Sequence, residues 1–390
     1  MELQNGAVPN KMKIVYVYAT FTTTGGTERI LTEKINRMTE NMGYDVTCIS
    51  CFQHPNEKNS FPMSEKVKQI NLGIPYFSQY KYKYPQRLWV RWRLYRQLRK
   101  SITHTVKQID PDILIGVSRF KANLISTIKC RAKKIIECHV VKGDTIFHIG
   151  NKRSFPVRVY YAIAEFLYIR AVERNADVIV TLTEKDKRLW KRAKRVEVIP
   201  NFSTLKVSQR SDCTVKRVIA VGRLEWEKGF GRLLEIWKII SFRHPDWYLD
   251  IFGRGRMHDT LLALIKLNKI NRVAIHDFTP DISAEYASSS ICVVTSYFES
   301  FSLVLLEALK HGLPCVAYDC PFGPESIIED ARCGFLVHDG EKRLFAERVC
   351  RLIEDQELRT HFSAAAIERS KAYDADVVMN QWNELFKSLV

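Results

Sequence analysis

Two acidic residues in the C-terminal half of the chain have a spacing that suggests a shared binding role. Glu299, Leu303 and Glu307 follow one another at intervals of four residues. A continuous helix would place all three on one face, because residues four apart are neighbours on an α-helix. Ser300 or Ser302 can cap the start of such a helix. The segment therefore predicts a capped helix that runs to Gly312.

The start of this helix is also a predicted anion site. It follows the apolar run 291–296, which is typical of a buried strand. Free backbone N–H groups near residues 301–304 can hold a phosphate group at the carboxyl edge of that strand. With phosphate there, Glu307 lies one turn further along and within reach of a ribose hydroxyl. The spacing also fits an ordinary core helix with one solvated glutamate, since glutamate is common in helices.

Two cations follow another predicted strand, 217–222. Arg223 and Lys228 lie in the segment AVGRLEWEKGF, just after Gly222. Two positive charges at the carboxyl edge of a strand can neutralise a diphosphate leaving group without a metal ion, through charge-assisted hydrogen bonds. A polar loop with solvated charges is the alternative interpretation.

Glycines mark two further points where a ligand can approach the backbone. Gly25 and Gly26 precede an amphipathic helix, and Gly253 and Gly255 follow the run 247–253. Glycine has no side chain, so backbone at these positions can contact a ligand closely. The first pair does not form a Gly-x-Gly-x-x-Gly pattern, and a tight turn explains the second pair equally well.

A histidine, His139, lies at or just past the end of the predicted strand 133–139, two residues after Glu137. In that position it can hydrogen-bond a reacting group or stabilise positive charge. A purely structural histidine is the alternative.

No metal or other cofactor is expected. Asp110-Pro111-Asp112 has the form of a DxD metal motif, but it precedes a strand, which puts it at the opposite edge of the sheet from the other candidates. The ten cysteines are scattered, mostly in apolar runs where cysteine acts as a small buried hydrophobe. The CxxC formed by Cys48 and Cys51 has no second pair at zinc-site spacing.

The elements that must position these residues are short apolar strands alternating with helices. Strands buried on both faces and separated by helices are typical of parallel, doubly wound sheets. Ligands of such sheets bind beyond the carboxyl ends of the strands. The sequence therefore predicts an α/β fold with two such domains side by side. The predicted strands are 13–19, 46–51, 112–118, 133–139 and 177–183 in the first half, and 217–222, 247–253, 272–278, 291–296 and 314–319 in the second.

The domain boundary is expected within the polar segment 198–217. This divides the chain into an N-terminal domain, 1–205, a C-terminal domain, 206–372, and a C-terminal helix, 373–390, that packs back on the N-terminal domain. The charge is uneven as well. Residues 1–200 carry 36 Lys and Arg against 17 Asp and Glu, whereas the remaining residues carry 24 against 26. The basic excess in the N-terminal half indicates that the two domains have different partners.

The N-terminal half contains a strongly basic segment, 79–108, with nine Lys or Arg and no acidic residue. Apolar residues recur in it every four positions, which predicts a helix with one buried face. Basic and aromatic side chains on its outer side suit an anionic membrane surface, and a solvated charged face is the alternative. No nucleic-acid module is present, so no nucleic-acid partner is expected. The predicted buried face is Val90, Leu94, Leu98, Ile102 and Val106, and the predicted membrane- or acceptor-facing residues are Arg87, Arg91, Trp92, Arg96, Arg99 and Lys100.

The chain has no run of about 18 uncharged apolar residues that would span a bilayer. Its N-terminus also lacks the apolar core of a signal peptide. We therefore expect a cytoplasmic protein that binds peripherally to the inner face of the plasma membrane.

In order and content, these motifs resemble the retaining GT-B glycosyltransferases of family 4. The resemblance covers nearly the whole chain and is most specific over 217–340. It implies the GT-B fold, in which two Rossmann-like domains face a central cleft. The matching pieces are GGTE (25–28), VIPN (198–201), VGRLEWEKG (221–229), FGRG (252–255), ESFSLVLLE (299–307), DCPFGPESI (319–327) and GFLVHDG (334–340).

The resemblance implies a role for each candidate residue in the C-terminal domain. Arg223 and Lys228 would grip the donor diphosphate and stabilise it as it leaves. Glu299 would contact hydroxyl groups of the donor sugar, and Glu307 would bind the ribose. The amides of Ser302 and Leu303 would lie near phosphate or sugar, and Gly253 is assigned to donor binding.

Two residues of the N-terminal domain receive roles in the same way. Gly26 would let its loop approach the donor diphosphate and the acceptor. His139 would lie close to the transferred sugar, although the match to the family is looser at this position.

The activity implied is metal-independent transfer of a sugar, with UDP-sugar as the default donor, to a hydroxyl of a saccharide or polyprenyl-linked acceptor. The expected setting is bacterial polysaccharide or lipopolysaccharide synthesis. Two other hypotheses stay open. One is a nucleotide-sugar epimerase or sugar phosphorylase on the same fold, and the other is a non-catalytic protein that only binds nucleotide-sugar.

Overall fold

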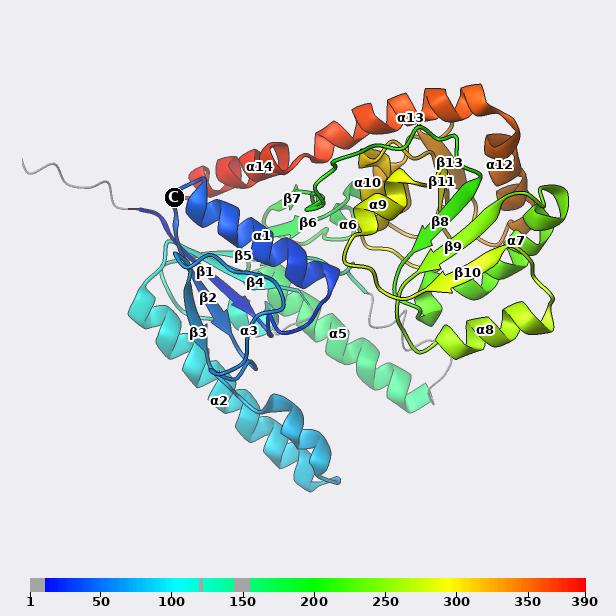
Figure 1. Ribbon diagram of the computed structural model, residues 1–390. Helices are drawn as coiled ribbons and strands as arrows, with labels where there is room; N and C mark the ends of the chain where they lie inside the picture. Colours follow the sequence, from blue (N-terminus) through cyan, green and yellow to red (C-terminus); the bar gives the residue numbers. More distant parts are fainter. Residues whose placement is uncertain (1–10, 119–121, 144–154) are drawn as a thin grey trace, which may run out of the picture. The chain divides into compact units, whose positions relative to one another are not determined.

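The computed structural model describes residues 11–118, 122–143 and 155–390. The chain forms two compact units, each built on a parallel sheet (Figure 1). Unit 1 comprises Met1–Ile199 and Met379–Val390, and unit 2 comprises Pro200–Val378. The chain thus leaves unit 1 a few residues before position 205, the boundary placed from the sequence, and later returns to it.

The described strands of unit 1 form a seven-stranded sheet in the order β3-β2-β1-β4-β5-β6-β7. Neighbouring strands run parallel. The sequence predicts all of them except β3 and β7, the two edge strands, which are short and lack a buried apolar run. The strands are β1 (Lys13–Tyr18), β2 (Asp45–Ser50), β3 (Lys68–Asn71), β4 (Ile113–Val117), β5 (Lys133–Glu137), β6 (Val178–Thr181) and β7 (Val196–Val198).

The basic segment of unit 1 forms the long helix α2 (Gln86–Ile109). Its buried residues are the five predicted from the four-residue spacing, and they pack against β1, β2 and β4 in one hydrophobic core. No described helix of the chain combines the length and apolarity needed to cross a bilayer. The other helices of unit 1 are α1 (Gly26–Glu40), η1 (Tyr76–Lys81), α3 (Ala122–Ser126), α5 (Phe155–Asn175), α6 (Glu184–Lys187) and most of α14 (Ala375–Lys387).

A buried ion pair lies where α1, β5 and α14 meet. Lys34 of α1 bonds to Glu137 of β5, and each side chain is only 2% exposed. The ring of Trp382, on α14, covers the Lys34 ammonium, which lies 4.3 Å from its centroid. Nearby, Tyr44 donates a hydrogen bond to Asn383 and packs edge-on against Phe386. These contacts attach α14 to unit 1, where it lies beside α1 (Figure 1).

The described strands of unit 2 form a six-stranded sheet in the order β10-β9-β8-β11-β12-β13. These strands also pair in parallel. The sequence analysis predicts all of them except β13. The strands are β8 (Arg217–Val221), β9 (Tyr248–Phe252), β10 (Val273–His276), β11 (Ile291–Val294), β12 (Cys315–Tyr318) and β13 (Gly334–Val337).

Helices α7 and α12 supply much of the core of unit 2. Trp237 of α7 and Phe345 of α12 are both fully buried in one cluster with strand residues such as Leu249. The sheet thus forms a fixed platform for the loops at its carboxyl edge. The helices are η3 (Trp226–Lys228), α7 (Phe230–Arg243), α8 (His258–Leu267), α9 (Ile282–Ala287), α10 (Leu303–Lys310), α11 (Pro324–Ile327), α12 (Lys342–Glu354), α13 (Gln356–Ser370) and η4 (Lys371–Tyr373).

We expect the Lys34–Glu137 pair to make unit 1 sensitive to acid. Burial alone would raise the pKa of Glu137, but the charges and hydrogen bonds of Lys34 and His139 lower it to about 2, from 4.5. A carboxyl whose pKa falls on folding stabilises the fold above its unfolded pKa. That contribution is lost as the pH falls from 4.5 towards 2, and a shift of this size corresponds to about 3 kcal/mol.

Urea unfolding between pH 2 and pH 7 measures this contribution. The double variant Lys34→Met/Glu137→Met removes both charges at similar volume, so its stability should fall less between pH 5 and pH 2 than that of the unchanged chain. Parallel pH dependence in the two proteins would show that the pair does not carry the acid sensitivity.

Candidate functional site

The candidate residues of unit 2 follow β8, β9 and β11, which are neighbours in the sheet. Because parallel strands all end at the same edge, the loops after these strands lie together. Gly253, after β9, lies against Gly222, after β8: a Cβ on Gly253 would come within 1.8 Å of the Gly222 carbonyl oxygen. Glycine at this position therefore lets the two loops touch.

Lys228 and Glu299 form the centre of the site. The Lys228 Nζ lies 2.7 Å from Glu299 Oε1, and Ser296 Oγ donates a hydrogen bond of 2.7 Å to the same oxygen. Gly229, directly after Lys228, has φ +68° and lies so close to the Thr295 carbonyl that a Cβ would clash. This glycine packs the Lys228 turn against the end of β11 and so brings the two charges together.

The expected helical face through Glu299, Leu303 and Glu307 is wrong. Helix α10 begins only at Leu303, and Glu299 lies in the preceding loop, where it forms a β-bridge with Phe322. In this loop the Glu299 side chain contacts Lys228 and Ser296, and Glu299 is not part of a helix. Four-residue spacing alone does not reveal where a helix starts.

Ser302 is the N-cap residue of α10, but its hydroxyl does not cap the helix. Its Oγ is buried and has no hydrogen-bond partner among the residues that the structure describes. The adjacent backbone N–H groups of the first helical turn, including that of Leu303, have no partner within the helix. An orphaned hydroxyl beside the positive end of a helix is a suitable place for an anion.

Glu307 lies one turn into α10 and is buried. The Tyr286 hydroxyl, on α9, donates a hydrogen bond of 3.3 Å to Glu307 Oε2. Burial, and next the charge of Glu307, raise the pKa of Tyr286 well above its usual value, so the phenol remains a donor. Tyr286 thus fixes the direction of the Glu307 carboxylate.

Arg223 does not join the Lys228–Glu299 pair. Its guanidinium lies 2.8 Å from Glu227, and its side chain is 70% exposed. The two cations of this loop therefore each bind a different carboxylate. Glu227, Ser296 and Tyr286 were missed in the sequence analysis. Glu227 lies four residues after Arg223, but the segment is a loop that leads into η3 and not an α-helix, so this spacing does not predict their contact.

In unit 1, Gly26 is the exposed first residue of α1, and Gly25 is its N-cap. His139 lies just beyond the end of β5 and is largely buried. Its Nε2 is 2.8 Å from Glu137 Oε1, the same oxygen that binds Lys34. Lys34 was missed, although its position three residues after Leu31 places a lysine on the apolar face of α1.

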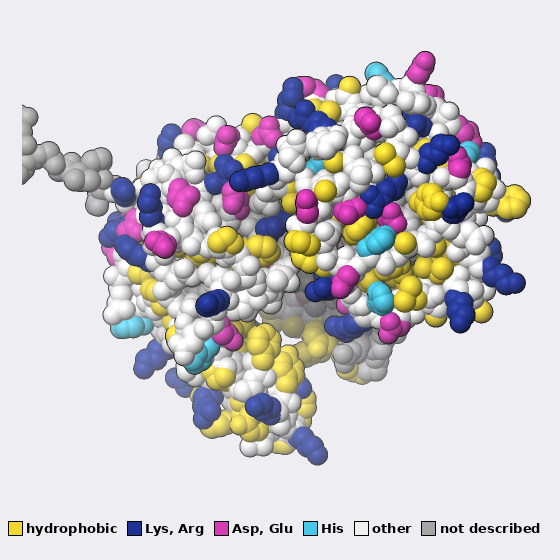
Figure 2. All heavy atoms as spheres, in the orientation of Figure 1, with side chains coloured by type: hydrophobic (Ala, Val, Ile, Leu, Met, Phe, Trp, Pro, Cys, Tyr) yellow, Lys and Arg dark blue, Asp and Glu magenta, His cyan; other side chains and the backbone are white. Residues whose placement is uncertain are grey.

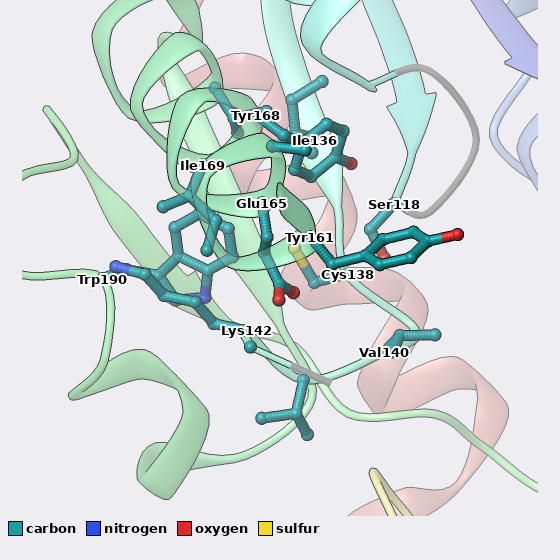
Figure 3. Close-up of a pocket in the computed structure, with 14 residues that line it drawn as sticks. Ser118, Ile136, Cys138, Val140, Lys142, Tyr161, Glu165, Tyr168, Ile169 and Trp190 are labelled. Atoms are coloured by element: carbon teal, nitrogen blue, oxygen red, sulfur yellow. The ribbon is translucent and has the colours of Figure 1, made fainter. Parts of the chain in front are cut away.

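A pocket of about 240 Å³ lies beside this strand end (Figure 3). Cys138 and Val140, on either side of His139 in the sequence, both line it. Trp190 and Tyr161 provide aromatic walls, and the Glu165 carboxylate points into the space between them (Figure 3). Aromatic walls around a carboxylate suit a ligand with an apolar body and hydroxyl groups.

The predicted residues of the basic helix differ in their exposure to solvent. Arg87 and Arg91 are half-buried: Arg87 lies over the Tyr80 ring at 4.2 Å, and Arg91 hydrogen-bonds Tyr160 of α5, which raises its pKa. The exposed members of the predicted set are Trp92, Arg96, Arg99 and Lys100.

Comparison with known protein families divides the chain at nearly the same place as the structure. Residues 24–205 match the family described as Glycosyltransferase Family 4. Residues 201–369 match the family described as Glycosyl transferases group 1. Together these two matches extend over both units.

Individual relatives agree with the family match. The amylovoran biosynthesis glycosyltransferase AmsD of Erwinia amylovora is 28% identical over 392 residues, with 96% of this chain and 99% of AmsD covered. Among solved structures, sucrose-phosphate synthase of Thermosynechococcus elongatus has a TM-score of 0.77 at 16% identity, covering 97% of this chain and 99% of that one. HepE of Anabaena, solved with UDP-glucose, has a TM-score of 0.71 at 18% identity, covering 97% of this chain and 100% of that one. The chain belongs to the group 1 glycosyl transferases, enzymes with the GT-B fold.

Proposed function

We propose that this enzyme is a retaining, metal-independent transferase that moves a sugar from a UDP-sugar to a hydroxyl of a lipid-linked saccharide. Bacterial surface polysaccharide synthesis is the proposed setting. The observation that carries the donor assignment is the Lys228–Glu299 pair in unit 2. The names of AmsD, for amylovoran synthesis, and of the HepE complex with UDP-glucose support the setting and the donor.

The donor would occupy the carboxyl edge of the unit 2 sheet. Its diphosphate would bind near the Ser302 hydroxyl and the start of α10, where a buried polar atom has no described partner. Glu307 would then accept hydrogen bonds from the ribose hydroxyls with Tyr286 behind it. Lys228 and Arg223 would exchange their carboxylate partners for the diphosphate, which leaves Glu299 to bind hydroxyl groups of the sugar.

The proposed reaction is a same-face substitution at the anomeric carbon. The bond from that carbon to the diphosphate oxygen breaks, and its electron pair goes to the diphosphate. The acceptor oxygen forms the new bond from the same face, and its proton passes to the departing phosphate oxygen. Arg223 and Lys228 stabilise the charge that develops on the diphosphate.

Metal independence rests on the donor set itself. Cations and helix N–H groups already supply the positive charge that a divalent ion would otherwise provide. Within the described residues, the one cluster with metal-binding geometry is His244, Cys350 and Glu354, and none of these belongs to the donor set. We place the acceptor in unit 1, at the pocket beside His139.

The Glu307→Ala variant should bind UDP about 10- to 100-fold more weakly, because it loses hydrogen bonds between a charged group and the ribose. Calorimetric titration with UDP, GDP and ADP in the presence of EDTA measures this effect and identifies the base. The matched control is Glu347→Ala, which changes an exposed glutamate on α12 and should bind UDP normally. Unchanged UDP affinity in Glu307→Ala contradicts the donor assignment. UDP binding that occurs only with a metal ion contradicts metal independence.

The Arg223→Ala variant should bind UDP somewhat more weakly, because one contact to the diphosphate is lost. Its main effect should be on turnover, with UDP released from UDP-sugar about 100-fold more slowly. Removal of one group that stabilises transition-state charge typically has an effect of this size. UDP release is followed with UDP-glucose, UDP-galactose and UDP-N-acetylglucosamine. Arg256→Ala, another exposed arginine of unit 2, is the control. Equal rates for Arg223→Ala and the unchanged enzyme would remove Arg223 from the site.

The lipid-linked acceptor is supported by an apolar and basic surface on unit 1. Hydrophobic and basic side chains mix over α2 (Figure 2). The Trp92 side chain is 53% exposed, and Arg96 lies over its ring at 4.7 Å. α2 contains no acidic residue. This composition suits a surface of anionic lipid headgroups.

Helix α5 adds an apolar surface that the sequence analysis did not predict. Phe166 and Leu167 are 56% and 60% exposed, and the buried residues of α5 are Val172 and Glu173, both near its C-terminal end. α5 has three exposed arginines and no exposed acidic residue. The Arg91–Tyr160 hydrogen bond joins this helix to α2. We therefore propose that α2 attracts an anionic bilayer and that α5 inserts apolar side chains into it.

Vesicle sedimentation at increasing salt separates these two contributions. Salt screens exposed charges. With phosphatidylglycerol vesicles, Arg96→Gln/Arg99→Gln/Lys100→Gln should therefore make binding less dependent on salt, because fewer charges remain to be screened. Phe166→Ser/Leu167→Ser should weaken binding by about 10- to 100-fold at every salt concentration, because apolar burial is lost.

Leu267→Ser, which changes an exposed leucine on α8 of unit 2, is the control and should bind as the unchanged protein does. Equal binding to phosphatidylcholine vesicles contradicts the electrostatic part of the proposal. The unchanged protein could instead self-associate. If Phe166→Ser/Leu167→Ser abolishes that self-association, a second copy of the chain, and not a bilayer, covers α5.

A further inference from the structure

Lys34 is an unusual residue for the interior of unit 1. Its side chain is 2% exposed and lies among the apolar residues of α1. Burial lowers the pKa of this lysine, and the Glu137 charge opposes the effect. A buried ammonium is costly unless it is paired. The fold core alone gives no reason for a lysine here, because an apolar residue of similar length would fill the space.

Glu137 connects this lysine to His139. One carboxylate oxygen, Oε1, binds both Lys34 and His139 Nε2, the latter at 2.8 Å. The other oxygen, Oε2, lies 3.5 Å from the hydroxyl of Tyr16. Glu137 carries a negative charge at neutral pH, since its pKa is about 2. An ionised carboxylate only accepts hydrogen bonds, so His139 Nε2 must carry a proton.

Nδ1 is therefore the nitrogen of His139 that can bind a substrate. In the neutral ring, a proton on Nε2 leaves Nδ1 as a hydrogen-bond acceptor. No hydrogen bond from Nδ1 to another part of the chain is found within the described residues. His139 thus lies at the carboxyl end of β5 with one nitrogen held and the other available.

Lys34 also sets the charge state of the cluster. Among the described residues, the side chains that hydrogen-bond Glu137 are those of Lys34 from α1, Tyr16 from β1 and His139, and the Cys138 thiol is close to its charge. Cys48 from β2 lies near Tyr16, and burial raises the pKa of both, so that both stay neutral. Without Lys34, the charge of the Glu137 carboxylate would be buried without a cation to balance it. With Lys34 present, the carboxylate charge is already balanced.

We propose that Lys34 and Glu137 are positioning residues that hold His139 as the neutral Nε2–H tautomer, with Nδ1 presented as an acceptor to the substrate. Trp382 completes the arrangement, because its ring covers the Lys34 ammonium from α14. This inference rests on the role of His139 in the proposed function. It adds that a hydroxyl of the bound sugar or acceptor donates to Nδ1.

Proton NMR of the full chain tests the Nε2–H bond from His139 to Glu137. A histidine N–H bonded to a carboxylate should give a slowly exchanging resonance far downfield, which disappears in His139→Gln. The resonance should also disappear in Lys34→Met/Glu137→Met, which removes both charges without leaving either one buried and unpaired. Absence of the resonance in the unchanged protein, or its persistence in the double variant, would overturn the inference.

UDP release from the UDP-sugar that the unchanged enzyme uses fastest tests the functional part. Lys34→Met/Glu137→Met should release UDP about 100-fold more slowly, the effect typical of a misplaced group, with unchanged affinity for UDP, which binds unit 2. Tyr44→Phe, which removes a separate contact to α14, is the control and should keep normal rates.

Comparison with His139→Ala separates the two possible failures. If His139→Ala releases UDP at the normal rate, the role of His139 in the proposed function is wrong. If His139→Ala is slow while Lys34→Met/Glu137→Met has a normal rate, the proposed function stands and the positioning role is wrong.

Discussion

The parallel pairing of the strands is the constraint on which the rest of this structure depends. Parallel strands require a crossover after every strand, so the loops that leave their carboxyl ends gather at one edge of each sheet. In unit 2 this places Gly222, Lys228 and Gly253 on loops that follow neighbouring strands. In unit 1 it places His139 just past the end of a central strand, with hydrophobic cores on the sheet behind it.

A second theme is that the cations described in each unit pair with carboxylates. Arg223 binds Glu227, Lys228 binds Glu299, and Lys34 binds Glu137. The first two pairs lie in η3 and the loops beside it and are partly accessible, which suits the proposed exchange of carboxylate for diphosphate. The third is buried and shares its carboxylate with an imidazole, so it cannot exchange partners without unfolding its surroundings. Similar pairs therefore serve different purposes, according to their burial.

Much of the fold could be predicted because apolar periodicity records burial directly. The five-residue buried face of α2 and the central strands of both sheets follow from spacing alone. The edge strands β3 and β7 could not, because a strand with one exposed side lacks a continuous apolar run. The helical placement of Glu299 failed for a different reason. Its pairing with Lys228 and Ser296 is a long-range contact, and no local pattern predicts it. Lys34 had a local signal, but only the tertiary structure names Glu137 as its partner.

The return of the chain to unit 1 has a consequence for how the protein is made. Residues 379–390 belong to unit 1, but the ribosome adds them only after all of unit 2 has been synthesised. Until then, the nascent unit 1 lacks Trp382, and the ammonium of Lys34 lacks the ring that covers it. The first unit to emerge is thus the last to be completed. A fragment that ends at residue 199 would contain the sheet of unit 1 but would leave the surroundings of Lys34 exposed to water. Chaperones and proteases act on such incompletely folded domains.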